Sequence, residues 1–214
     1  MESIARATLK LRGCMAWATL KLRHKIVRII APKVYKEIHA LRMRCDIPRP
    51  MTLFLKEYAK SELVGAEIGV ASGDNAMNLL QMLPIKKLYL IDPYLPYVEE
   101  DRILDFTGAR KIAKKRLLKY PQVKFIEETS EKASKELTDE LDFVYIDGNH
   151  SYEFVKKDIK LYSSFVKPGG VIGGHDFAYP GVTRAVMEFV TANDYKYGID
   201  FFIKLPDWWL IIKR

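Results

Sequence analysis

Cysteine is scarce in this chain of 214 residues, which contains only Cys14 and Cys45. Two cysteines are too few for the disulfide framework of a secreted domain, and neither belongs to a CxxC pair of the kind that binds zinc or exchanges electrons. We therefore expect both thiols to be reduced and the protein to be cytoplasmic.

Long apolar runs are also missing from the sequence. No stretch approaches the roughly 18 residues that a membrane span needs, and the N-terminus has no continuous apolar segment like that of a secretory signal. A disordered chain is excluded as well, because 49% of the residues are hydrophobic and 29% are charged, which is the usual balance of a globular protein.

Acidic residues are rare only in the first 50 positions. That segment has 12 Lys and Arg against 3 Asp and Glu, whereas residues 51–214 have 23 against 24, so the net charge of +8 comes from the N-terminal segment. The composition therefore predicts a basic appendage over 1–50 and a nearly neutral domain over 51–214.

The basic segment contains an internal repeat. Ala-Thr-Leu-Lys-Leu-Arg occurs at 7–12 and again at 18–23, an offset of 11 residues, so both copies present the same face of a helix. Apolar residues gather on one stripe of this amphipathic helix and basic residues lie opposite. We expect the stripe to pack on the following domain or a second copy of the chain, or residues 1–30 to lie on an anionic membrane surface; nucleic-acid binding is least favoured.

After residue 63, short β-type runs alternate with helical patterns. This alternation predicts an α/β fold: a Rossmann-like seven-stranded sheet, mostly parallel with an antiparallel last strand, plus the N-terminal helical appendage. Pro206-Asp207 is expected to form a tight turn before the last strand. The expected strands are 64–70, 88–92, 123–127, 143–147, 170–174, 199–205 and 208–213. The expected helices are 51–63, 74–83, 101–119, 130–140, 151–166 and 181–193.

Glycines and a carboxylate follow the first two strands, at the edge where open α/β sheets bind ligands. Gly69 and Gly73 allow a sharp turn and close approach of a ligand to a helix N-terminus. The spacing matches neither the dinucleotide fingerprint nor a phosphate loop, which favours a ligand with few phosphate contacts. Asp92 ends the second strand, where a carboxylate accepts hydrogen bonds from a ribose diol or, alternatively, caps a turn.

A polar cluster is expected at the ends of two later strands. Asp147 and His150 follow one strand, and His175 and Asp176 follow the next, so four polar side chains gather at the sheet edge. Such residues hold a divalent cation or move protons. The alternative is that the aspartates cap helices and His150 is an ordinary loop histidine.

Five segments occur in order along residues 60–214: Glu67-Ile-Gly-Val-Ala-Ser-Gly73, Asp92, Ile146-Asp-Gly-Asn-His-Ser-Tyr152, Lys167-Pro-Gly-Gly-Val-Ile-Gly-Gly-His-Asp176 and Pro180-Gly-Val-Thr-Arg-Ala-Val-Met-Glu-Phe189. Together they resemble the class I S-adenosylmethionine-dependent methyltransferases. More closely, they resemble the subgroup with Asp-Gly-x-His-x-Tyr and Gly-His-Asp motifs that is often associated with O-methylation of sugars and natural products. The resemblance does not extend to residues 1–50.

The resemblance implies S-adenosyl-L-methionine as the cofactor. The first motif would form its turn, Asp92 would bind the ribose hydroxyls, the loop after the third strand would border the adenine, and Asp147 would face the methionine amino group or a metal. The implied cofactor-binding residues are Glu67, Gly69, Val70, Ala71, Ser72, Gly73, Asp92, Pro93, Tyr94, Glu128, Thr129, Ser130 and Asp147.

Methyl transfer to a hydroxyl requires that the acceptor be aligned with the sulfonium carbon and lose its proton. We predict that His150 or His175 is the base and that Asp147 assists catalysis. Asp147 and Asp176 would orient the base or hold Mg²⁺, for which the predicted ligands are Asp147, His175 and Asp176.

The acceptor is expected to be a small molecule, a sugar or a lipid-linked glycan hydroxyl. N-methylation, a nicotinamide-dependent oxidoreductase and a membrane- or RNA-associated cofactor-binding module without turnover are the alternatives. A nucleic-acid partner is not expected, whereas peripheral membrane association and a homo-oligomer stay open.

Overall fold

The computed structural model describes residues 49–214 except 60, 100, 194, 200–205 and 214. The predicted amphipathic helix, its membrane contact and most of the appendage therefore lie outside the described residues. In the part of the chain that is described, no helix has the length and apolar character to cross a bilayer.

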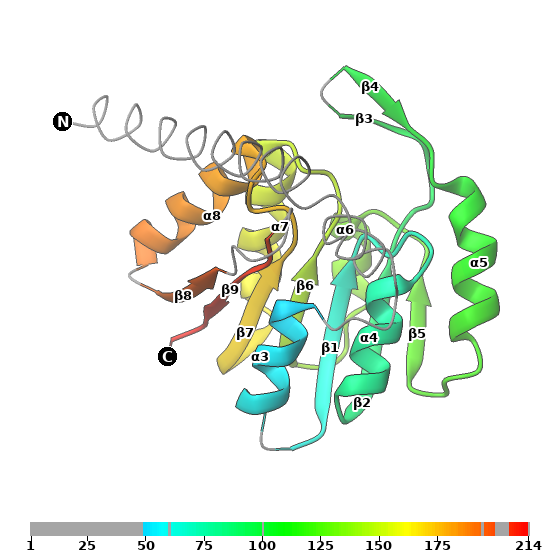
Figure 1. The fold of residues 1–214 in the computed structure, drawn as a ribbon, viewed down its shortest axis with the longest axis horizontal. Coiled ribbons are helices and arrows are strands. Elements are labelled where there is room, and N and C mark those ends of the chain that lie inside the picture. The colour runs from blue at the N-terminus through cyan, green and yellow to red at the C-terminus, as the bar shows by residue number, and fades with distance from the viewer. Residues whose placement is uncertain (1–48, 60, 100, 194, 200–205, 214) are drawn as a thin grey trace, which may run out of the picture.

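A seven-stranded sheet forms the centre of the structure (Figure 1), as the sequence predicted. Its order is β5-β2-β1-β6-β7-β9-β8, and the first five strands are parallel, while β9 runs antiparallel to both of its neighbours. The strands are β1 (Leu63–Ile68), β2 (Ile85–Ile91), β5 (Val123–Ile126), β6 (Leu141–Ile146), β7 (Val166–Gly174), β8 (Lys196–Ile199) and β9 (Trp208–Ile211).

Helices cover both faces of the sheet, so its central strands are buried on two sides. Successive residues of β6 show this directly: Phe143 and Tyr145 join the core on one face, and Val144 and Ile146 join the core on the other. The first face carries α3 (Pro50–Tyr58), α4 (Asp74–Met82) and α5 (Thr107–Leu117). The second carries α6 (Ser130–Ala133), α7 (Tyr152–Ser163) and α8 (Pro180–Asn193).

The helix expected at 101–119 is shorter than predicted because a small hairpin precedes it. β3 (Tyr97–Glu99) and β4 (Arg102–Leu104) pair antiparallel and project from the carboxyl edge of the main sheet (Figure 1). Asp105 then accepts a hydrogen bond from the backbone N–H of Thr107, at 2.9 Å, which forms a turn directly before α5. The helix expected at 130–140 is likewise reduced to α6 and one 3₁₀ turn, Ser134–Glu136.

The end of the chain also corrects one prediction. The structure describes a strand at Lys196–Ile199, whereas positions 200–205 of the strand expected at 199–205 lie outside the described residues. Ile199 pairs with Trp208, so Pro206-Asp207 is not a tight turn between adjoining strands. Asp207 is instead fully buried, and its carboxylate accepts hydrogen bonds from the backbone N–H of Met51 at 3.1 Å and the hydroxyl of Tyr145 at 3.0 Å. This carboxylate joins β9 to α3 and β6.

Asp158 joins α7 to the first residue of α6. Its side chain is buried, and Ser130 Oγ donates to Asp158 Oδ1 at 2.5 Å. Burial raises the pKa of Asp158 from 3.8 to about 6, although the bond from Ser130 and the charge of Lys157 act in the opposite direction. The folded protein therefore favours the protonated form of this carboxyl more than the unfolded chain does.

We expect Asp158→Asn to stabilise the protein in a pH-dependent way. Protonated Asp158 contributes its full stabilisation at a pH below 3.8, the pKa of this carboxyl in the unfolded chain. The stabilisation is lost as the pH rises through about 6, its pKa in the folded protein. Asparagine stays neutral and still accepts from Ser130, so the advantage of the variant in free energy of unfolding should grow by about 1–2 kcal/mol between pH 5 and pH 8. Urea unfolding at both pH values measures this, with Glu153→Gln on the exposed side of α7 as the control; an equal advantage at both pH values would contradict the prediction.

Candidate functional site

A cavity of about 500 Å³ opens at the carboxyl ends of β1, β2 and β6, where the sequence predicted a ligand site. Most of the predicted cofactor residues line this cavity. They are Glu67, Gly69, Val70, Ala71, Ser72, Asp92, Pro93, Thr129, Ser130 and Asp147. Gly73, Tyr94 and Glu128 are not part of its wall, and their roles are described below.

The loop after β1 has a backbone that requires its glycines. Gly69 has φ +84°, and a Cβ there would lie 2.1 Å from the carbonyl oxygen of Asp147, so a side chain is excluded. Gly73 has φ +79° and forms the N-cap of α4. Ala71, where many members of the resembled family carry a second glycine, also has positive φ, at 45°. The loop thus exposes its backbone to the cavity.

Asp92 holds this loop in place. Its Oδ2 accepts hydrogen bonds from the backbone N–H groups of Val70 and Ala71, both at 2.9 Å, and its Oδ1 accepts from Tyr94 N–H at 2.7 Å. A carboxylate has about four acceptor positions, so one on Oδ1 is left for a ligand. Asp92 therefore shapes the loop and also lines the cavity, whereas Tyr94 is buried behind it.

Two polar side chains beneath the loop have acceptor atoms without partners. Glu67 is 1% exposed and accepts from Asn75 Nδ2 at 3.2 Å through Oε1, but among the described residues nothing donates to Glu67 Oε2 or Asn75 Oδ1. Burial raises the pKa of Glu67 well above its usual value, and the hydrogen bond from Asn75 only partly opposes this. Since buried acceptors without partners are costly, these atoms indicate a ligand that donates hydrogen bonds.

The predicted adenine loop is only partly at the cavity. Thr129 and Ser130 line it, whereas Glu128 forms a surface ion pair with Lys132 at 3.3 Å.

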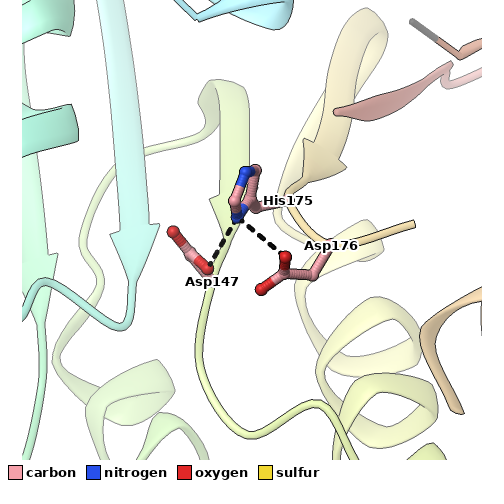
Figure 2. A group of neighbouring side chains, drawn as sticks. All are labelled: Asp147, His175 and Asp176. Carbon is pink, nitrogen blue, oxygen red and sulfur yellow. Dashed lines mark ion pairs between the residues drawn. The ribbon is translucent and has the colours of Figure 1, made fainter. Parts of the chain in front are cut away.

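The structure brings the predicted catalytic and metal residues together in one cluster, formed by Asp147, His150, His175 and Asp176. His175 Nδ1 lies 3.6 Å from Asp147 Oδ1 and 3.2 Å from Asp176 Oδ1 (Figure 2). His150 Nε2 lies 2.8 Å from Asp176 Oδ2 and 3.6 Å from Asp147 Oδ1. Potential ligand atoms of Asp147, His175 and Asp176 all lie within 4.8 Å of one another.

The carboxylates of the cluster control its protonation. Burial by itself lowers the pKa of His150, but Asp147, Asp176 and Glu99 outweigh this and raise it to about 11. Burial also lowers the pKa of His175 by itself, but Asp147 and Asp176 outweigh this effect and raise the pKa to about 9. In turn, the imidazoles hold the pKa of Asp147 well below its usual value, although burial alone would raise it. The carboxylates of the cluster therefore hold positive charge beside them, either as protons on the two imidazoles or as a bound cation.

Besides Asn75 in α4 and Asp158 in α7, which line the cavity, two residues of the cluster were not predicted from the sequence. Glu99, on the β3–β4 hairpin, contacts His150, and Arg49, just before α3, lies 3.7 Å from Asp147 Oδ2 and 3.8 Å from Asp207 Oδ1. Arg49 also lines the cavity, although the sequence placed it in the basic appendage. Neither residue belongs to a motif, so no pattern in the sequence marked it.

Of the two candidate bases, only His150 lines the main cavity. His175 is not part of its wall; the backbone N–H of His175 donates to the carbonyl of Ile146 at 3.1 Å, and Trp208 Nε1 donates to the carbonyl of His175 at 3.2 Å.

A viral protein of uncharacterised function, R132 of Acanthamoeba polyphaga mimivirus, is 28% identical over 137 residues, which are 62% of this chain and 62% of that protein. The matched segment thus spans less than two thirds of this relative.

Solved structures of low sequence identity share the fold. A Staphylococcus aureus protein provisionally named a caffeoyl-CoA O-methyltransferase aligns with a TM-score of 0.60 and 15% identity, over 91% of this chain and 99% of its own. A Streptococcus mutans protein, provisionally named a methyltransferase and solved in complex with SAH, aligns with a TM-score of 0.58 and 18% identity, over 78% and 99%. Others bear the names of an rRNA methylase and an N-methyltransferase.

Residues 66–177, just over half of the chain, match the profile of a family described as "Methyltransferase domain". This range runs from β1 through the glycine loop and Asp92 to the Gly-His-Asp segment after β7. The chain therefore belongs to this methyltransferase family.

Proposed function

We propose that this protein transfers a methyl group from S-adenosyl-L-methionine to a hydroxyl oxygen. The observation that carries the proposal is one cavity with two ends of different chemistry. Glu67 and Asn75 offer unpartnered buried acceptors at the glycine loop, and Asp147 and His150 bring the carboxylate–imidazole cluster to the same space. Family membership and an SAH-bound neighbour of the same fold support this assignment.

The residues present fit the cofactor. Glu67 Oε2 and Asn75 Oδ1 would accept hydrogen bonds from the ammonium group of its methionine part, and the free acceptor position of Asp92 would take a ribose hydroxyl. Thr129 and Ser130 would border the adenine. When bound, S-adenosyl-L-methionine supplies a methyl group on a positively charged sulfur.

His150 is the base in this proposal, because it lines the cavity and His175 does not. A hydroxyl is a weak nucleophile at neutral pH, so its proton must leave as the oxygen attacks. His150 Nε2 would receive that proton, and the facing carboxylates of Asp147 and Asp176 would stabilise the resulting imidazolium.

A divalent cation held by Asp147, His175 and Asp176 forms the second part of the proposal. The residues fit such an ion: among the described side chains, Asp176 Oδ1 and His150 Nε2 are buried polar atoms without a hydrogen-bond partner, despite their short contacts. Carboxylate oxygens suit Mg²⁺ or Mn²⁺, and the imidazole suits Zn²⁺. Positive charge there would offset the carboxylates and so favour the neutral imidazole that a base requires.

The wall of the cavity favours an acceptor with an apolar or sugar-like face. Leu95, Pro96, Tyr97, Phe106 and Phe154 contribute apolar and aromatic surface beyond the cofactor-binding residues. Aromatic rings of this kind stack on sugars and flat apolar groups. A sugar, a natural product or a lipid-linked glycan would therefore present its hydroxyl to His150; N-methylation is the alternative acceptor chemistry.

Glu67→Gln is expected to weaken cofactor binding. Loss of a charge-assisted hydrogen bond to an ammonium group, worth about 1.5–3 kcal/mol, should raise the Kd for S-adenosylhomocysteine by about 10- to 100-fold. Isothermal titration calorimetry measures this, with the surface variant Glu131→Gln as the control. Unchanged affinity in Glu67→Gln would remove Glu67 from the site, and absence of binding to the wild-type protein would overturn the proposed function.

His150→Ala is expected to lower kcat by about 10²- to 10⁴-fold, because it removes the base. His175→Ala should act mainly through the cation. The assay is formation of S-adenosylhomocysteine with a panel of hydroxylated acceptors, after each variant is shown to bind S-adenosylhomocysteine like the wild type. If both variants keep full turnover, the assignment of the base is wrong.

The proposed cation site is tested by titrating Mn²⁺ into the metal-free protein and following the signal of free Mn²⁺ by electron paramagnetic resonance. Asp176→Asn should weaken binding by more than about tenfold, because it removes a charged ligand. Glu188→Gln, which changes a carboxylate on the surface of α8, should leave the affinity unchanged. Equal affinity of Asp176→Asn and the wild type would place the ion elsewhere.

A further inference from the structure

The β3–β4 hairpin carries one buried acidic residue into the carboxylate–imidazole cluster. Glu99 is 8% exposed, whereas Val98 and Ile103, paired with each other on the hairpin, are 64% and 77% exposed. Because side chains alternate across a strand, the hairpin has one face toward the cluster and one toward solvent. A buried carboxylate is costly unless it is hydrogen-bonded or paired with a positive charge, and the residue that binds Glu99 is His150.

Glu99 binds His150 through both of its oxygens. Oε2 accepts from the backbone N–H of His150 at 2.9 Å, and Oε1 lies 2.9 Å from its ring Nδ1. The neighbouring Asn149 adds a contact, since its Nδ2 donates to the carbonyl of Val98 at 3.3 Å. The loop after β6 is therefore docked onto the hairpin at three points.

These contacts determine how the imidazole is presented. With Nδ1 donating to Glu99, Nε2 is the atom that faces Asp147 and Asp176. Tyr179 stacks on the ring, with centroids 5.2 Å apart, and limits its rotation. A carboxylate on one nitrogen thus fixes the orientation of the ring and the direction in which the other nitrogen points, as it does in proton-transfer sites generally.

The same hairpin also forms the acceptor side of the cavity. Tyr97, two residues before Glu99 on the same face of β3, lines the cavity and stacks on Phe106 at 6.1 Å between centroids. Leu95 and Pro96 lead into the strand and line the cavity as well. One short element therefore contacts both the space for the acceptor and the imidazole.

We propose that Glu99 is a positioning residue for His150, and that the β3–β4 hairpin couples the seating of the acceptor to the orientation of the base. This inference rests on the proposed function, in which His150 receives the acceptor's proton. Glu99 does not line the cavity and does not touch the cofactor space, so it acts only through the imidazole.

The test compares Glu99→Gln with Asp101→Asn. Both variants remove one negative charge from the hairpin, and asparagine tolerates the positive φ of Asp101, which is exposed. Glutamine offers only one carbonyl oxygen in place of two carboxylate oxygens, so one contact to His150 is lost. We expect Glu99→Gln to lower kcat by about 10- to 100-fold, with unchanged affinity for S-adenosylhomocysteine, whereas Asp101→Asn keeps the wild-type kcat.

A second readout does not depend on activity. In ¹⁵N-labelled protein, the ring nitrogens of the four histidines report their tautomers, and His150→Gln identifies the signals of His150. We expect Glu99→Gln to shift the His150 Nδ1 and Nε2 signals and Asp101→Asn to leave them in place. A hairpin that only stabilised the fold would lower the melting temperature without this selective change.

The outcomes separate the two proposals. If wild-type protein transfers methyl groups but Glu99→Gln has wild-type kcat and unshifted His150 signals, the role of Glu99 is overturned and the proposed function stands. If wild-type protein neither binds S-adenosylhomocysteine nor forms it, the proposed function fails. A shift of the His150 signals would then still show that Glu99 orients the ring, but the coupling to an acceptor would be overturned.

Discussion

The carboxyl edge of the sheet gathers several buried or partly buried carboxylates, and the organisation of the site follows from their need for hydrogen-bond donors or positive charge. Glu67, Asp92, Asp147 and Asp176 lie at or directly after the ends of adjoining strands, and the hairpin adds Glu99. Each buried carboxylate needs donors or positive charge to be stable in a folded protein. The donors and positive charges that each carboxylate finds determine its role in the cavity.

Each carboxylate meets the need by different means. Asp92 is satisfied by backbone N–H groups, so it becomes the support of the glycine loop. Asp147 and Asp176 are balanced by His150 and His175, and Arg49 adds a guanidinium near Asp147. Glu67 is left with an unpartnered oxygen, which marks the part of the site where a ligand completes the hydrogen bonding.

The predicted strands were confirmed where the local apolar pattern and the geometry of the sheet agree. Apolar runs such as that of β6 predicted strands that are buried on both faces of the sheet. Because parallel strands bring their carboxyl ends to one edge, Asp147 and His175 were expected to lie close together. The hairpin at Tyr97–Leu104 was missed because its two three-residue strands are too short to show a periodicity. The turn expected at Pro206-Asp207 was wrong because Ile199 pairs with Trp208, and because Asp207 is buried, where it accepts hydrogen bonds from Met51 N–H and the Tyr145 hydroxyl.

Local patterns along the chain were enough to predict the sheet, the glycine loop and the cluster of aspartates and histidines, because strand patterns and strand-end residues are local features. That His150 rather than His175 faces the cavity, and that Glu99 and Arg49 join the site, is seen only in the folded protein. These contacts join residues about 50 or more positions apart along the chain, such as Glu99 to His150. Their formation depends on how separate elements pack, and no spacing within a single segment encodes it.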